Sequence, residues 1–203
     1  MTERTVKPGN KPARECPEQP ASPIHAAPKQ PLAREAWKEF ADRLVPALVG
    51  LEEDEFLILT IKGTNRYVQF VDQGAYGMRA EAVSDYYLPE DEHLSEEDYA
   101  ALMRLGWNAP TNLPDQFGHK ADGSPNYFLD LARPVSYLDV AVLAVHTLAN
   151  VYGASHPGRL EYDAKSMDGM SIRFPHLPVR RRPAPPRGSS ESRSVRASTI
   201  PMP

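Results

Sequence analysis

The chain has one cysteine, Cys16, among its 203 residues, so no disulfide can form within it. A single free cysteine fits a reducing compartment such as the cytosol. The sequence also lacks any run of about 18 consecutive apolar residues, the length that a membrane-spanning helix needs. No apolar stretch follows the first residues, so we expect no signal peptide. The expected location is the cytoplasm.

The motifs that usually mark an active site are missing as well. There is no Gly-rich phosphate loop and no strained serine elbow. His119, His156 and His176 lie in expected loops without metal-ligand spacing, and His146 lies in a very apolar segment where we expect a packed side chain. Residues 90–93, Glu-Asp-Glu-His, could hold a divalent cation, but their irregular spacing favours a solvated loop. We therefore expect no catalytic residue, no metal and no cofactor, while catalytic groups that converge from distant positions stay an open alternative.

Proline is abundant, and it is concentrated near the two ends of the sequence. The 21 prolines are about double the roughly 5% share that is usual. Residues 1–32 are rich in proline and have no apolar periodicity, so we expect a disordered arm there. Residues 166–203 are rich in Arg, Pro and Ser, and we expect a second disordered tail. The folded domain is expected over residues 33–165.

Charge is distributed unevenly along the chain. The net charge is −4; residues 1–33 carry +2 and residues 176–203 carry +5, which leaves −11 for the residues between them. An acidic domain is a poor candidate for binding phosphate backbones, so nucleic acid could be bound only through the tail. The tail arginines have two interpretations, a contact for nucleic acid or anionic lipid and a solubilising segment. They are Arg180, Arg181, Arg182, Arg187, Arg193 and Arg196.

Hydrophobic periodicity predicts an α+β fold in which an antiparallel meander sheet packs with about three helices. We expect helices over residues 32–50, 95–105 and 136–152, and strands over residues 55–62, 66–72, 78–84 and 126–133. A short closing strand is expected at residues 160–162. Pro46 should kink or divide the first helix, because proline removes a donor and clashes with the preceding turn. The last helix is apolar nearly all round and should be central or face a dimer partner.

The first expected strand is apolar on both faces. Phe56 and Ile58 alternate with Leu57 and Leu59, so one set faces each side of the sheet. Each face must then be covered by the domain's own helices or by a partner. Two interpretations stay open for the apolar residues of this hairpin, a peptide-binding surface and ordinary core. The candidate peptide-binding residues are Phe56, Ile58, Val68 and Phe70.

A structural anchor is expected where the second helix ends. Gly106 suits the left-handed backbone of a helix C-terminus, Trp107 follows as a large buried aromatic, and Pro110 prevents continuation. Asn126, in a Pro-Asn-Tyr sequence that opens the next strand, completes the anchor. This is packing chemistry, and it favours a binding module over an enzyme.

The order of elements resembles the TY-Chap family, which groups domains like type III secretion chaperones with YbjN-like proteins. The resemblance rests on Leu-Gly-Trp-Asn-Ala-Pro at residues 105–110, Pro-Asn-Tyr at 125–127 and Thr-Leu-Ala-Asn-Val-Tyr at 147–152, and it covers about residues 33–165. It implies an α+β fold, a cytosolic location, no cofactor, no catalytic residues and a homodimer as one option.

The resemblance and the residues together predict a non-enzymatic module that binds a partner polypeptide as a chaperone. The partner would pair with a sheet edge and lie on apolar surface. The acidic domain would favour a basic partner. The alternative is a regulatory or scaffold protein whose Arg-rich tail contacts nucleic acid or anionic lipid.

Overall fold

The computed structural model describes residues 31–111 and 123–183. Residues 1–30 of the expected N-terminal arm and residues 184–203 of the expected tail, with Arg187, Arg193 and Arg196, lie outside the described residues, as does His119. Residues 31 and 32, also assigned to the arm, begin the first helix. The helices are α1 (Pro31–Val49), α2 (Glu96–Leu105) and α3 (Tyr137–His146), and the strands are β1 (Glu55–Ile61), β2 (Tyr67–Asp72), β3 (Met78–Ala82), β4 (Tyr127–Leu131), β5 (Leu160–Ser166) and β6 (Arg180–Arg181). The α+β fold is thus confirmed.

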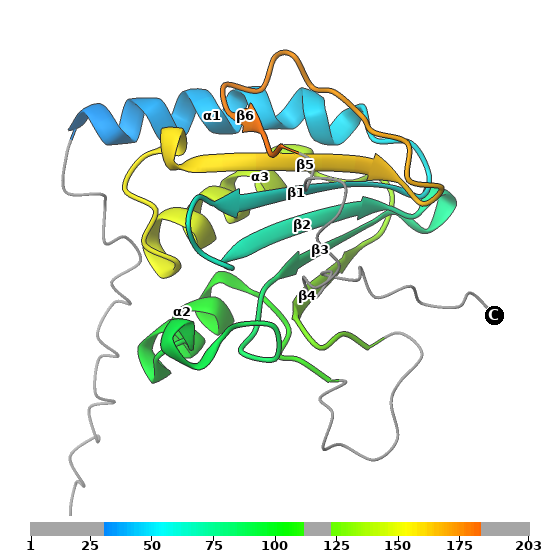
Figure 1. Ribbon diagram of the computed structural model, residues 1–203. Helices are drawn as coiled ribbons and strands as arrows, with labels where there is room; N and C mark the ends of the chain where they lie inside the picture. Colours follow the sequence, from blue (N-terminus) through cyan, green and yellow to red (C-terminus); the bar gives the residue numbers. More distant parts are fainter. Residues whose placement is uncertain (1–30, 112–122, 184–203) are drawn as a thin grey trace, which may run out of the picture.

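All strands belong to one sheet, in the order β4-β3-β2-β1-β5-β6 (Figure 1). The meander β1 to β4 and the pairing of β5 with β1 are antiparallel. β6 runs parallel to β5, so the sheet is mixed and not purely antiparallel as expected. β5 is also longer than expected and lies next to β1, because Leu160, Tyr162 and Ala164 alternate into the core.

The register of the β1–β2 hairpin decides which side chains enter the core. Leu57 is opposite Phe70 and Leu59 is opposite Val68, and directly paired residues share a face. These four side chains are at most 1% exposed and belong to one hydrophobic cluster with α1 and α3. We call this the first face of the sheet. The expected alternation along β1, with Leu57 and Leu59 on the core side, is confirmed.

Both ends of α2 follow the sequence signals. Ser95 and Asp98 form a reciprocal capping box at its start, and Gly106 adopts a left-handed conformation with φ 101° at its end. We expected a kink or a division at Pro46; α1 continues through this residue, so the division is wrong, while the kink stays a prediction. Pro46 is exposed and three residues from the end of the helix, so the carbonyl of Asp42 that loses its donor can face water.

Packing continues past residue 165, where the sequence suggested that the tail begins. Phe174, Leu177 and Val179 are at most 9% exposed and belong to the hydrophobic core. The backbone amide of Phe174 donates to the hydroxyl of Tyr162 on β5. The apolar side chains of this segment that enter the core are separated by prolines and polar residues, so the segment shows no periodic pattern in the sequence.

Candidate functional site

The four residues predicted to bind peptide do not form one surface. Val68 and Phe70 point into the core on the first face and are at most 1% exposed. Phe56 and Ile58 point to the opposite face, because they alternate with Leu57 and Leu59 along β1. Val68 and Phe70 are therefore removed from the candidate site. Ile58 is partly exposed and remains in it, whereas Phe56 lies on the same face but is only 8% exposed.

The opposite face, which we call the second face, carries a mixture of apolar and charged side chains. Its central rows follow from the register: Phe56, Val71, Arg79 and Asp130 in one, and Ile58, Gln69, Glu81 and Phe128 in the next. Ile58, Val71 and Phe128 are partly exposed. Within the described parts of the chain, no helix lies over this face, whereas α1 and α3 pack on the first (Figure 1).

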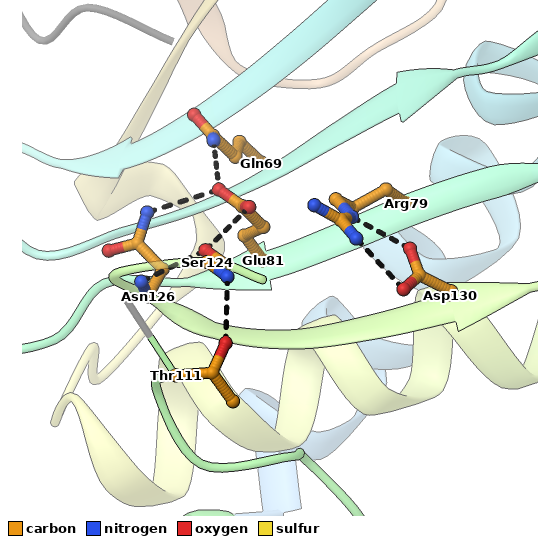
Figure 2. Close-up of polar contacts among 7 residues, drawn as sticks. All are labelled: Gln69, Arg79, Glu81, Thr111, Ser124, Asn126 and Asp130. Atoms are coloured by element: carbon orange, nitrogen blue, oxygen red, sulfur yellow. Dashed lines mark hydrogen bonds and ion pairs between the residues drawn. The ribbon is translucent and has the colours of Figure 1, made fainter. Parts of the chain in front are cut away.

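A buried carboxylate organises one part of the second face (Figure 2). Glu81 is 4% exposed and accepts hydrogen bonds from Ser124 Oγ at 2.8 Å and Asn126 Nδ2 at 3.1 Å. Gln69 Nε2, on the neighbouring strand, donates to the same carboxylate at 2.5 Å. Three neutral donors thus compensate the burial of this carboxylate. The cluster fixes residues 124–126, which lead into β4, against β2 and β3.

Asn126 connects this cluster to the core. Its side-chain oxygen accepts from the amide of Ser84, and its Nδ2 also donates to the Tyr67 hydroxyl at 3.3 Å. Burial raises the pKa of Tyr67, because the phenolate would lose hydration there. Asn126 is 2% exposed. Its role as a structural anchor stays a prediction.

The second polar feature of this face is an ion pair between β3 and β4. Arg79 donates from Nε to Asp130 Oδ1 at 2.7 Å and from Nη2 to Oδ2 at 2.9 Å, a bidentate arrangement (Figure 2). The Arg79 side chain is 5% exposed and that of Asp130 is 47% exposed. The guanidinium carbon of Arg79 lies 5.3 Å from the centroid of the Phe128 ring. The pair therefore presents an acidic group at the rim of the sheet.

The outer edge of β4 is paired along only part of its length. Asn108 and Phe128 exchange backbone hydrogen bonds of 3.0 and 3.1 Å, so the backbone groups of Phe128 point away from β3. The amide and carbonyl of Asp130, two residues on, point the same way. Among the described residues, nothing pairs with them. A short open edge therefore adjoins the second face.

The sequence contained a signal for this site that our interpretation missed. In β3, Arg79 and Glu81 alternate with Met78, Ala80 and Ala82, which is the pattern of a strand with one polar face. Both charged residues are at most 5% exposed. Their partners Asp130 and Ser124 are over 40 residues away in the chain, so only the fold brings them together.

The remaining predicted residues have structural positions. Trp107 is 1% exposed, and Pro110 follows where the chain runs beside residues 124–128. Glu92, in the acidic run considered for a cation, accepts hydrogen bonds from the backbone and side chain of Asn65. Over residues 31–111 and 123–183, no group of three or more His, Cys, Asp or Glu side chains is placed to bind a metal ion. In the same ranges, no helix is long and apolar enough to cross a membrane.

The helix α3 exposes two large apolar side chains. Leu138 is 55% exposed and Val142 is 40% exposed, while Val140, Ala141 and Ala144 are buried. This agrees with a helix that is apolar nearly all round. That a second copy of the chain covers Leu138 and Val142 stays a prediction.

Known proteins and protein families show what the chain is similar to. No curated protein and no solved structure gave a match. The protein-family model TY-Chap3, described as T3SS (YopN, CesT) and YbjN peptide-binding chaperone 3, matches residues 30–166. This range runs from the start of α1 to the end of β5 and contains the second face and the edge of β4. The chain therefore belongs to the TY-Chap3 family.

Proposed function

We propose that the protein is a non-enzymatic chaperone that binds an extended segment of a partner polypeptide along the outer edge of β4 and over the second face. The observation that supports this most directly is that, among the residues the structure describes, the backbone of Asp130 is unpaired and no helix covers the sheet face beside it. An extended peptide can add a strand to such an edge through main-chain hydrogen bonds. The family description supports a peptide ligand.

The side chains next to this edge suggest how a partner is selected. Phe128, Val71 and Ile58 offer partly exposed apolar surface for alternate side chains of an added strand. Asp130 is half exposed although it is paired with Arg79, so its carboxylate is accessible from the rim. Together with the acidic charge of the domain, this favours a basic partner.

The decisive variant is Asp130→Pro in the full-length chain. The amide of Asp130 points away from β3, so proline removes the donor of the edge and leaves the β3–β4 hydrogen bonds in place. Asp130→Ala is the matched control, because it removes the ion pair to Arg79 and keeps the amide. Polypeptides that copurify with each variant from the native host would be identified by mass spectrometry, after circular dichroism has confirmed the fold.

We expect Asp130→Pro to lose the polypeptides that the unaltered protein and Asp130→Ala both retain. A second pair tests the face: Ile58→Ser should weaken capture, and Val142→Ser, on the outward side of α3, should not. Retention of the same polypeptides by Asp130→Pro would exclude strand addition at β4. Equal loss from Asp130→Pro and Asp130→Ala would assign the effect to the ion pair.

A further inference from the structure

The opposite edge of the sheet is occupied by a short basic segment of the chain itself. β6 comprises only Arg180–Arg181 and runs parallel to β5. The amide of Arg182 donates to the carbonyl of Tyr162 at 2.6 Å. This segment lies outside residues 30–166, which match the family. The edge of β5 thus carries an added strand that the family domain does not include.

The neighbouring part of the same edge is closed by a hairpin. The amide of Ile172 donates to the carbonyl of Ala164 at 2.9 Å, and the amide of Ser166 donates to the carbonyl of Met170. These bonds occupy the second half of β5. Only the first half, around Glu161 and Tyr162, is paired with β6. The site that β6 fills is therefore about four residues long, roughly 13 Å of extended chain.

Two carboxylates on β5 flank this site. Arg182 Nε lies 3.1 Å from Glu161 Oε1, and Arg181 Nη2 lies 3.9 Å from Asp163 Oδ1. Glu161 and Asp163 alternate with the buried Tyr162, so both belong to the second face of the sheet. The backbone of β5 and this pair of acids together suit an extended segment that carries arginine.

The chain's own segment satisfies this site incompletely. Arg181 Nη2 donates a hydrogen bond of 2.5 Å to Ser171 Oγ and lies 3.9 Å from Asp163, which is too far for a hydrogen bond to that carboxylate. Arg181 Nε is buried and has no hydrogen-bond partner among the described residues. Phe174, Leu177 and Val179 anchor the preceding residues in the core. Arg180 is exposed, so β6 itself contributes little buried surface. An occupant with better geometry could replace β6 without unfolding the segment before it.

We propose that the first half of the β5 edge, with Glu161 and Asp163, is a docking site for a short arginine-rich extended segment of a partner polypeptide, and that residues 180–182 are its intrachain occupant. This inference rests on the proposed function, because it assigns a second contact to the same kind of partner. Beyond the proposed function, it names arginine as the side chain that is recognised. It also makes β6 a competitor that lowers the affinity of the protein for the partner segment.

The test uses a fluorescent hexapeptide, Pro-Val-Arg-Arg-Arg-Pro, identical to residues 178–183, and the full-length chain. In the variant Arg181→Glu with Arg182→Glu, the new carboxylates repel Asp163 and Glu161, so β6 should leave the edge. We expect the peptide to bind this variant at least about tenfold more tightly than the unaltered chain, measured by fluorescence anisotropy. Raising the salt concentration should reduce this affinity.

Two matched variants separate docking from general acidity. Arg34→Glu with Arg104→Glu makes the same change in net charge at exposed positions on α1 and α2, and it should not tighten binding. Adding Glu161→Gln and Asp163→Asn to the Arg181→Glu, Arg182→Glu variant should abolish the increase in peptide affinity. Equal affinity of the two charge-reversed variants would overturn the proposal.

Hydrogen exchange on the unaltered chain gives a second measurement that needs no substitution. The amide of Arg182 should exchange faster than the amide of Ile172, and excess unlabelled peptide should accelerate it further by displacing β6. Protection of Arg182 equal to that of Ile172, with no response to peptide, would refute the competition. Asp130→Pro should not change the affinity of the hexapeptide for the β5 edge. Docking at β5 can therefore be refuted while peptide capture at β4 stands, and capture at β4 can be refuted while docking at β5 stands.

Discussion

The indole Nε1 of Trp107 donates a hydrogen bond of 3.0 Å to Thr147 Oγ1. The hydroxyl of Thr147 in turn donates to the carbonyl of Leu143 in the preceding turn of α3, at 2.9 Å. Both side chains are at most 1% exposed. Thr147 begins a π-helical turn, Thr147–Val151, that continues α3. The aromatic residue after α2 therefore fixes the end of α3 by a specific polar contact as well as by its volume.

Substitution of Trp107 should destabilise the protein more than substitution of Thr147. Trp107→Ala should lower the free energy of unfolding by about 3–5 kcal/mol, because it deletes a large buried side chain. Thr147→Val should lower it by about 1–3 kcal/mol, because the indole N–H stays buried without an acceptor. Urea denaturation measures both. In a double-mutant cycle with Trp107→Phe, non-additivity is expected, and strict additivity would show that the hydrogen bond contributes nothing.

Loss of the Glu81 carboxylate should destabilise the second face. Glu81→Ala leaves Gln69, Ser124 and Asn126 without their common acceptor, and it should lower the free energy of unfolding by at least about 2 kcal/mol. Glu35→Ala, at an exposed position on α1, is the control and should have little effect. Chemical denaturation compares the two. Equal stability of both variants would mean that the cluster is dispensable for folding.

Gly77 should resist substitution because β4 approaches it closely. Its φ is 109°, and a Cβ atom would lie 2.0 Å from the carbonyl oxygen of Leu131. Gly77→Ala therefore adds a clash with backbone to the roughly 1–3 kcal/mol of a strained backbone conformation. Gly63 has a φ of 80°, and a Cβ atom there would meet nothing within 4 Å, so Gly63→Ala measures the cost of the backbone conformation without a clash. Thermal unfolding should show a clearly larger loss for Gly77→Ala, and equal losses would contradict the close approach.

Stability should fall in alkaline solution. Burial raises the pKa of Tyr67 and of Tyr152, whose hydroxyl donates to the carbonyl of Val83 at 2.7 Å. A folded-state pKa above the unfolded value of about 10 means that the stabilisation is complete below pH 10 and is lost as the pH rises above it. The thermal midpoint should therefore decrease between about pH 9.5 and 11.5. Tyr152→Phe should reduce this decrease relative to the unaltered chain, and an unchanged slope would exclude Tyr152 as a contributor.

Local signals in the sequence predicted the elements of the fold well. Ser95 and Asp98 cap α2, and Gly106 ends it, because capping depends on residues only a few positions apart. The hairpin of β1 and β2 and the alternation of Leu57 with Ile58 follow from β-strand periodicity. The family resemblance, confirmed over residues 30–166, rests on similarly local patterns.

The composition of the candidate site was decided by contacts between distant residues. Alternation alone could not show that Val68 and Phe70 share a face with Leu59 and Leu57, because a shift of one residue in register exchanges the two faces. The same applies to Arg79 with Asp130 and to Glu81 with Ser124, which the chain separates widely. β6 pairs with β5, and Phe174, Leu177 and Val179, which precede β6 in the chain, pack in the core.

The sequence by itself thus determined the α+β class, the positions of the helices and the meander, and the acidic charge of the domain, since these depend on neighbours in the chain and on composition. Tertiary structure alone decided which face of the sheet α1 and α3 cover and which backbone groups of β4 are unpaired within residues 31–111 and 123–183. It also placed two arginines beside Glu161 and Asp163. The physical reason is that burial and strand pairing arise from contacts between segments far apart in the chain, whose register and order local preferences do not encode.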